Sequence, residues 1–299
     1  MALDQAAALR ELMRPAPRQP LRRTRVLAVA SGKGGVGKTN LTVNLAIALA
    51  REGKRAVVLD GDLGLANVDV LLGIHPRYTL QHVMSGQRSL GEVMVPAPGG
   101  IWVVPGASGL EELADLSEEQ RQSLISALTE LDGRADVLLI DTAAGVSREV
   151  SAFLEAAPEV IVVTTPEPTA ITDAYALIKV ASSARQAVAP AAPASGGPRF
   201  RLVVNQANDV GEAVGVARKL QTVARQFLSV EIQSLGYVPS DRSVPRSTRG
   251  QVPLLVAYPS SPAALRVVDL ARRLTAAAEQ PAAGDAGVAS FLRRMAGVA

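Results

Sequence analysis

Short apolar segments recur along the chain, and a longer segment with helical periodicity separates most of them from the next. The strand-like segments are residues 25–30, 56–60, 101–104, 137–141, 160–164, 200–205 and 234–238. The helical patterns occupy residues 38–51, 117–131, 169–184 and 211–228. Because the strand-like segments are apolar at successive positions, both faces of their sheet must be covered. This alternation predicts an α/β fold with a doubly wound, mainly parallel sheet and helices on both faces.

The composition fits one large aliphatic core. Of the 299 residues, 48% are hydrophobic but only 3% are aromatic, so aliphatic residues and alanine must fill that core. The chain has no cysteine, which excludes disulfides and any metal or iron–sulfur site with thiolate ligands. The sequence contains no signal-peptide pattern and no apolar run of about 18 residues, so we expect a cytoplasmic protein.

Stretches rich in proline, alanine and glycine divide the chain near its two ends. We expect one domain over residues 25–277, flanked by linkers at 15–24 and 278–287. The linkers isolate a short N-terminal segment, 1–14, and a short C-terminal segment, 288–299. Each terminal segment can therefore have a function separate from that of the domain.

The glycine-rich stretch GKGGVGKT, residues 32–39, lies where the first strand-like segment ends and the first helical pattern begins. It fits the G-x-x-x-x-G-K-[ST] pattern of a phosphate-binding loop. Its backbone N–H groups are expected to surround phosphate at a helix N-terminus. Lys38 would reach the β- and γ-phosphates, and the Thr39 hydroxyl would bind Mg²⁺. The expected nucleotide contacts are Gly34, Gly35, Val36, Gly37, Lys38, Thr39 and Asn40.

Lys33 is a second lysine in the same turn. A plain phosphate-binding loop leaves this position unconstrained, and a solvated surface charge is the simple alternative. However, the sequence K-G-G-V-G-K-T resembles the deviant Walker A motif of the MinD/ParA family of dimerising ATPases. In that family the first lysine contacts the phosphates bound to the partner subunit, like an arginine finger in trans. The resemblance implies ATP and Mg²⁺ as cofactors, and an ATP-dependent homodimer whose hydrolysis depends on dimerisation.

Three carboxylates stand at the ends of strand-like segments. The resemblance implies that Asp62, in VVLDGD, orients or deprotonates the attacking water, while Asp60 supports the Mg²⁺ shell. It also implies that Asp141, in VLLIDTAAG, is the Walker B carboxylate that binds Mg²⁺. A purely coordinating role is the alternative for Asp60 and Asp62, and a helix cap is the alternative for Asp141.

Other positions match the nucleotide and dimer contacts of the same family. Asn205, at the end of its strand, and Pro239 with Asp241 match the segments that contact adenine. An amide can read the base edge with both a donor and an acceptor. Gln206 stands where many relatives have arginine, so no stacking role is assigned to it. Asp173 falls where relatives place an acidic partner for the signature lysine; a solvated carboxylate on a helix face is the alternative.

The C-terminal stretch VASFLRRMAGVA has the pattern of an amphipathic helix. Phe291, Leu292 and Met295 share one face, and Arg293 and Arg294 lie on the other. This pattern favours an interfacial helix on an anionic membrane. One short helix would bind weakly, whereas two copies in a dimer would bind through avidity. A helix packed on the protein's own core is the alternative, and both states can occur with different nucleotides.

The N-terminal stretch DQAAALR, residues 4–10, resembles the D-Q-A-x-x-L-R element of the FlhG (FleN/YlxH) branch of this family. That branch regulates flagellar number and placement, and its N-terminal element activates FlhF, a GTPase related to the signal recognition particle. The resemblance implies that Gln5, Leu9 and Arg10 contact an FlhF-like GTPase. From the residues alone, this stretch is an amphipathic helix capped by Asp4.

These features predict an FlhG-like ATPase that associates reversibly with the inner face of the cell membrane, at the cell pole. Flagellar switch (C-ring) proteins are further expected partners. The alternative is a MinD- or ParA-like positioning ATPase with another cargo, and nucleic acid is not expected to bind. An enzyme that transforms a small metabolite is disfavoured, because the sequence has no substrate motif besides that of the nucleotide.

Overall fold

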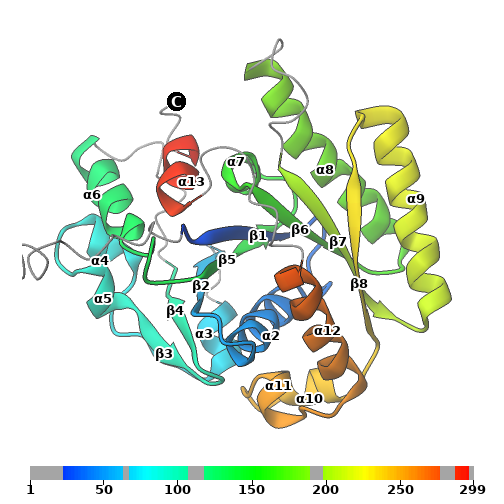
Figure 1. The fold of residues 1–299 in the computed structure, drawn as a ribbon, viewed down its shortest axis with the longest axis horizontal. Coiled ribbons are helices and arrows are strands. Elements are labelled where there is room, and N and C mark those ends of the chain that lie inside the picture. Colours follow the sequence, from blue (N-terminus) through cyan, green and yellow to red (C-terminus); the bar gives the residue numbers. More distant parts are fainter. Residues whose placement is uncertain (1–22, 63–66, 107–117, 189–197, 277–286, 296–299) are drawn as a thin grey trace, which may run out of the picture.

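The computed structural model describes residues 23–62, 67–106, 118–188, 198–276 and 287–295. In this part of the chain, one layer of β-sheet lies between helices on both faces (Figure 1). The N-terminal segment 1–14, with Gln5, Leu9 and Arg10, lies outside the described residues. Most of the two expected linkers lies outside them as well.

Within the described residues, eight strands form one sheet in the order β3-β4-β2-β5-β1-β6-β7-β8. The strands are β1 Arg25–Ser31, β2 Ala56–Gly61, β3 Val95–Ala97, β4 Ile101–Val104, β5 Val137–Ala144, β6 Glu159–Thr164, β7 Arg199–Ala207 and β8 Ile232–Pro239. All neighbouring strands are parallel except β3 and β4. The predicted doubly wound, mainly parallel sheet is therefore confirmed.

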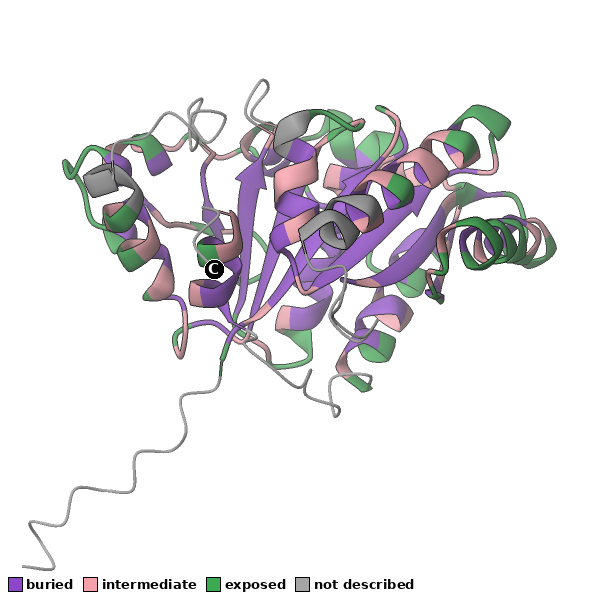
Figure 2. Cartoon of the chain, turned by 90° about the horizontal axis from the view of Figure 1, so that it is seen from above, coloured by how far each residue is buried: buried purple, intermediate pink, exposed green. Residues whose placement is uncertain are grey.

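Helices cover the two faces of the sheet and enclose an apolar core on each. The first face is covered by α4 Leu80–Met84, α5 Leu90–Val93, α6 Glu118–Thr129, α7 Arg148–Ala156, α8 Pro168–Val188, α9 Val210–Leu228 and α13 Val288–Met295. The second is covered by α2 Lys38–Arg51, α3 Asn67–Leu72, α10 Ser243–Arg249, α11 Leu254–Ala257 and α12 Pro262–Ala276. Figure 2 shows the sheet as a buried layer between them.

The central strand β1 is apolar at every position between its two terminal residues. Val26, Ala28 and Ala30 belong to the core on one face, whereas Leu27 and Val29 belong to the core on the other, and all five are fully buried. Side chains of a strand point alternately to the two faces, so a strand covered on both faces needs no polar position. Polar residues stand only at its two ends, Arg25 at the start and Ser31 at the carboxyl end.

The structure differs from the sequence prediction at one edge of the sheet. Strand β3 has only three residues, including Pro96, and pairs antiparallel with β4. So short a segment has no readable periodicity, and the prediction missed it. Trp102 of β4 is 45% exposed, although it lies in a strand. Its strand lies only one position from the edge, where the short β3 is its outer neighbour.

The C-terminal helix α13 packs on the core of the same chain. Phe291 is buried and stacks on Phe153 of α7, with ring centroids 6.4 Å apart. Asp132 accepts hydrogen bonds from the N–H groups of Val288 (3.2 Å) and Ala289 (3.3 Å) at the start of the helix. The structure thus shows the docked alternative for this segment. In the part of the chain that the structure describes, no helix combines the length and apolarity needed to span a membrane.

A largely buried ion pair network joins three neighbouring strands to α12 near the amino-terminal ends of those strands. Glu159 accepts from Arg25 at 2.7 and 2.8 Å and from Arg201 at 2.9 Å. Arg25 also donates to the carbonyl of Leu274 at the end of α12 (2.6 Å). Burial alone would raise the pKa of Glu159, but the two guanidinium groups outweigh it and hold that pKa below its usual range. The network fastens β1, β6 and β7 to α12.

Glu159→Gln should therefore lower the free energy of unfolding by about 3 kcal/mol at pH 7, because it leaves the buried Arg201 and the partly buried Arg25 without their charged partner. The folded-state pKa of Glu159 lies below that of the unfolded chain, so its contribution is complete above the unfolded pKa and is lost as pH falls through the folded one. Denaturant unfolding at pH 7, and at a pH below the folded-state pKa of Glu159, measures the loss of stability. Glu231→Gln, at an exposed carboxylate, is the control; equal effects of the two variants would contradict the prediction.

Candidate active site

A cleft of about 860 Å³ opens at the edge of the sheet where β1, β5, β7 and β8 end. Its lining includes residues 34–41, Asp62, Asn67, Asn205, Gln206, Pro239 and Asp241. In doubly wound sheets, ligands bind in the crevice outside the carboxyl ends of the strands. Segments of the chain far apart in sequence thus meet around one site of ligand size.

The glycine-rich loop adopts a backbone that requires glycine. Gly35 and Gly37 have φ angles of 81° and 87°, in the left-handed region that other residues rarely adopt. A side chain at Gly37 would also collide with the amide of Asn205. Helix α2 begins at Lys38, so its free N–H groups and the positive end of its dipole face the cleft. This geometry can hold a phosphate.

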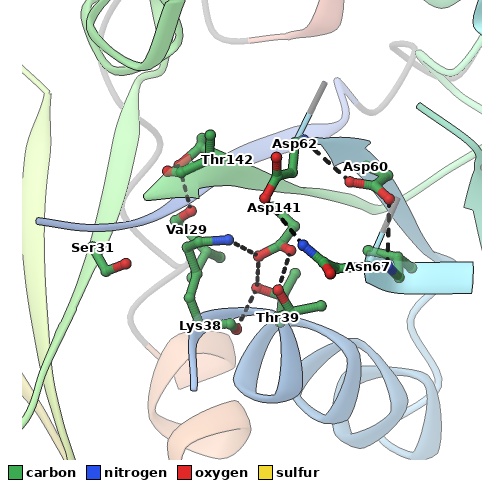
Figure 3. A network of polar contacts seen from close by, with 12 residues as sticks. Val29, Ser31, Lys38, Thr39, Asp60, Asp62, Asn67, Asp141 and Thr142 are labelled. Carbon is green, nitrogen blue, oxygen red and sulfur yellow. Dashed lines mark hydrogen bonds and ion pairs between the residues drawn. The ribbon is translucent and has the colours of Figure 1, made fainter. Parts of the chain in front are cut away.

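The carboxylate of Asp141 is the centre of the polar network in Figure 3. It is fully buried in the second half of β5 and pairs with Lys38 Nζ at 3.0 Å. The hydroxyls of Thr39 and Thr42 donate to it at 2.7 and 3.0 Å. These contacts neutralise the buried charge and bring the end of β5 against the first turn of α2. Phosphate oxygens would compete with Asp141 for the same ammonium group.

Two further carboxylates lie at the end of β2. Asp60 is buried and accepts from the N–H groups of Asp62 (3.1 Å) and Val68 (3.3 Å). Burial raises the pKa of Asp60 to about 7, and the negative charge of Asp141 adds to the effect. The carboxylate of Asp62 faces the cleft and accepts from Asn67 Nδ2 at 3.1 Å. The Asp62 side chain is thus fixed by Asn67 but accessible from the cleft, whereas Asp60 is buried within the protein.

The donor set at this edge suits Mg²⁺ bound together with a phosphate. Asp60 and Asp141 are buried carboxylates whose mutual repulsion a divalent cation would relieve, and the Thr39 hydroxyl lies against the second of them. Among the described residues, no group of three or more His, Cys, Asp or Glu side chains is arranged to hold a metal by itself. Mg²⁺ typically takes one or two protein carboxylates and completes its shell with water and substrate phosphates.

Lys33 points to a different partner from the one that the sequence indicated. Its ammonium pairs with Glu167 at 2.7 Å and donates a hydrogen bond to the Thr169 hydroxyl at 3.1 Å, and the lysine side chain is 40% exposed. Asp173 instead packs its backbone against Gly32, where any side chain would collide with it. The prediction overlooked Glu167, although it lies in the same TTPEPTAITDAY stretch as Asp173. A pairing of Asp173 with a lysine of another subunit stays a prediction.

The residues expected to contact adenine line the cleft, but their polar atoms are partly engaged by the protein. Asn205 donates to the carbonyl of Val36 at 2.7 Å. Asp241 accepts from the N–H groups of Ser243 (2.8 Å) and Ala263 (3.0 Å), which outweighs the effect of burial and lowers its pKa. Asp241 thus caps the segments after β8. Their contacts with a base stay predictions.

Helix α10 forms a wall of the cleft that the sequence did not indicate. Thr248 accepts from Asn40 Nδ2 at 3.1 Å, and Arg242 and Arg249 line the same side. Asn44, one turn after Asn40, accepts from the N–H of Leu255 at 2.9 Å. These contacts join the first turns of α2 to segments more than 200 residues away. No motif in the sequence marked them.

Comparison with known proteins agrees with this geometry. Residues 24–191 match the AAA_31 family model, described as an AAA domain. The chain is 44% identical to the antiactivator FleN of Pseudomonas aeruginosa over 249 residues, which are 83% of this chain and 85% of FleN. It is 33% identical to the flagellum site-determining protein YlxH of Helicobacter pylori over 227 residues, or 76% and 73% of the two chains.

A solved structure supports the same relationship. It is the septum site-determining protein MinD from Pyrococcus horikoshii, complexed with Mg-ADP. The two folds agree with a TM-score of 0.67 at 26% identity, over 86% of this chain and 98% of that one. The phosphate-binding loop, the buried carboxylates and the sheet topology described above are thus set in a fold that this relative shares.

The two lysines of the loop should differ in their effects on substitution. Lys38→Ala should weaken Mg·ATP binding about 100-fold, since it removes a charge-assisted contact with phosphate. Lys33→Ala should leave that affinity largely intact but abolish ATP-dependent dimerisation and hydrolysis. Calorimetry and light scattering measure the two properties. A Lys33→Ala protein that dimerises and hydrolyses ATP normally would show that this lysine is a surface charge.

Proposed function

This chain belongs to the AAA-domain family of MinD/ParA-type ATPases, and on that basis we propose that it regulates flagellar number and placement through ATP-dependent dimerisation. The observation that carries the proposal is the 44% identity to FleN over most of both chains. The similarity to YlxH, a flagellum site-determining protein, points to the same process. ATP with Mg²⁺ is the ligand of the cleft.

In the proposed reaction, the loop N–H groups and Lys38 bind the phosphates, so that Lys38 exchanges its buried partner Asp141 for the nucleotide. Thr39, Asp60 and Asp141 would hold Mg²⁺, which supplies positive charge to the β- and γ-phosphates. Asp62 orients the water that attacks the γ-phosphorus, and the bond to the ADP oxygen breaks. Lys33 leaves Glu167 and crosses to the phosphates of the second subunit, so hydrolysis requires the dimer.

The C-terminal helix is proposed to bind an anionic membrane in the ATP-bound dimer. Its apolar residues Phe291 and Leu292 are buried against the core in this structure, with Met295 partly buried beside them. Membrane binding therefore requires α13 to leave α7. Arg293 is exposed, whereas the apolar face of the helix is covered. Two released helices per dimer would hold the protein at the membrane.

Truncation after Asp285 should abolish ATP-dependent binding to anionic liposomes, and Arg293→Glu should weaken it about ten-fold, because it reverses a charge at the lipid surface. Arg293→Glu leaves the buried face of α13 intact, which Phe291→Glu would not. Co-sedimentation measures both. Arg218→Glu, at another exposed arginine, on α9, is the control. Unchanged sedimentation of the truncated chain would leave α13 with a packing role only.

The N-terminal segment is proposed to activate an FlhF-like GTPase related to the signal recognition particle. Its Asp4–Gln5 start and apolar Leu9 and Leu12 give an amphipathic helix that would order against a partner. Gln5 would place an uncharged amide next to the attacking water in the partner's GTP site, with Arg10 beside it. Flagellar switch proteins are proposed as a second class of partner.

A peptide of residues 1–14 should by itself accelerate GTP hydrolysis by the cognate FlhF-like GTPase. Gln5→Ala should remove most of the acceleration without loss of binding, whereas Leu9→Ala should weaken binding, because it removes an apolar anchor. Single-turnover GTP hydrolysis and calorimetry separate the two effects. If a saturating peptide leaves the rate unchanged, the flagellar assignment fails and a MinD-like positioning ATPase with another cargo takes its place.

A further inference from the structure

Two consecutive side chains of β7 hold the phosphate-binding loop from outside. Asn205 Nδ2 donates to the carbonyl of Val36 at 2.7 Å, and Gln206 Nε2 donates to the carbonyl of Gly35 at 3.3 Å. Both side chains come from the end of β7, where its register with β8 shifts. The two acceptors are consecutive peptide groups of the loop. β7 therefore contacts the loop at the peptides whose N–H groups are expected to face phosphate.

The planar peptide bond makes these outer contacts relevant to the inner surface of the loop. In a trans peptide, the carbonyl and the following N–H lie in one plane and point in opposite directions. A hydrogen bond that holds the Gly35 carbonyl therefore also fixes the direction of the Val36 N–H. The bond to the Val36 carbonyl does the same for the N–H of Gly37. Preorganised N–H donors bind an anion without the cost of ordering them first.

The backbone of Gln206 is itself unusual. Its φ of 57° lies in the left-handed region, and among the described residues only Ser229 and Gln251 share this property without being glycine. Ser229 caps α9, and Gln251 directly follows the cap of α10, so both lie at helix ends, where this conformation is common. Gln206 lies inside β7 instead. A strained backbone of this kind persists only where the surrounding contacts hold it, and such residues cluster at functional sites.

We propose that Gln206 is a positioning residue of the nucleotide site, which orients the Val36 N–H toward phosphate by holding the Gly35 carbonyl. Asn205 acts in the same way on the next peptide. The inference rests on the proposed nucleotide site and adds to it a residue that acts through the loop backbone. The two hydrogen bonds act on the backbone of the phosphate-binding loop. They should therefore affect the affinity for phosphate groups, whether or not a base is attached.

The test replaces Gln206 by asparagine, which tolerates a left-handed backbone but is one methylene too short to reach the Gly35 carbonyl. Gln251→Asn makes the same change at a strained glutamine outside the cleft and is the matched control. Gln206→Arg, which restores a long donor, is the rescue. Each protein is titrated by calorimetry with Mg·ATP and with Mg·tripolyphosphate, which has no base, and is melted without nucleotide.

Gln206→Asn should bind both ligands about five-fold more weakly, the effect of one lost hydrogen bond, with no loss of thermal stability. Gln206→Arg should regain most of that affinity, and Gln251→Asn should bind as the unaltered protein does. The proposal is overturned if Gln206→Asn weakens ATP but not tripolyphosphate, which would mark a base contact, or if it binds both normally. Binding of ATP by Lys38→Ala at full affinity would instead refute the nucleotide site itself, so the two failures are distinguishable.

Discussion

The rest of the site depends on one buried carboxylate, that of Asp141. A carboxylate with no exposed surface is costly unless it is paired, and here an ammonium group and two hydroxyls surround it. All three donors come from the first turns of α2, directly after the glycine-rich loop. The charge of Asp141 thus holds the start of α2, and with it the loop, against β5. A bound nucleotide would replace Asp141 in part as the anionic partner of Lys38, because its phosphates also attract the ammonium group.

The loop is held in place from both sides of the sheet centre. On one side lies the carboxylate of Asp141 in β5, and on the other the amides of Asn205 and Gln206 at the end of β7. The loop has little side-chain bulk of its own, since its glycines serve backbone conformation and close approach. Neighbouring elements therefore determine the conformation of the loop, and the phosphate site depends on strands that are far apart in the sequence.

The two ends of the domain meet at a second anchor. Asp132 Oδ1 accepts from the N–H of Thr24, just before β1, and from that of Val288 at the start of α13. Thr24, which directly precedes the expected boundary at residue 25, is itself buried. The docked α13 stacks on α7, the helix that follows β5 and its Asp141. The C-terminal helix is thus packed on the element that follows the nucleotide site.

The sequence by itself determined the class of fold and the phosphate-binding loop, because both are written in local patterns: apolar runs of strand length, helical periodicity, and glycines before Lys38 and Thr39. It could not reveal Glu167 as the partner of Lys33, the exposure of Trp102, or the contact of Gln206 with Gly35. Each of these joins residues distant in sequence or depends on position within the sheet. Only the packing of the strands decides which side chains meet at its edge, since hydrogen bonds across that distance leave no periodic trace in the chain.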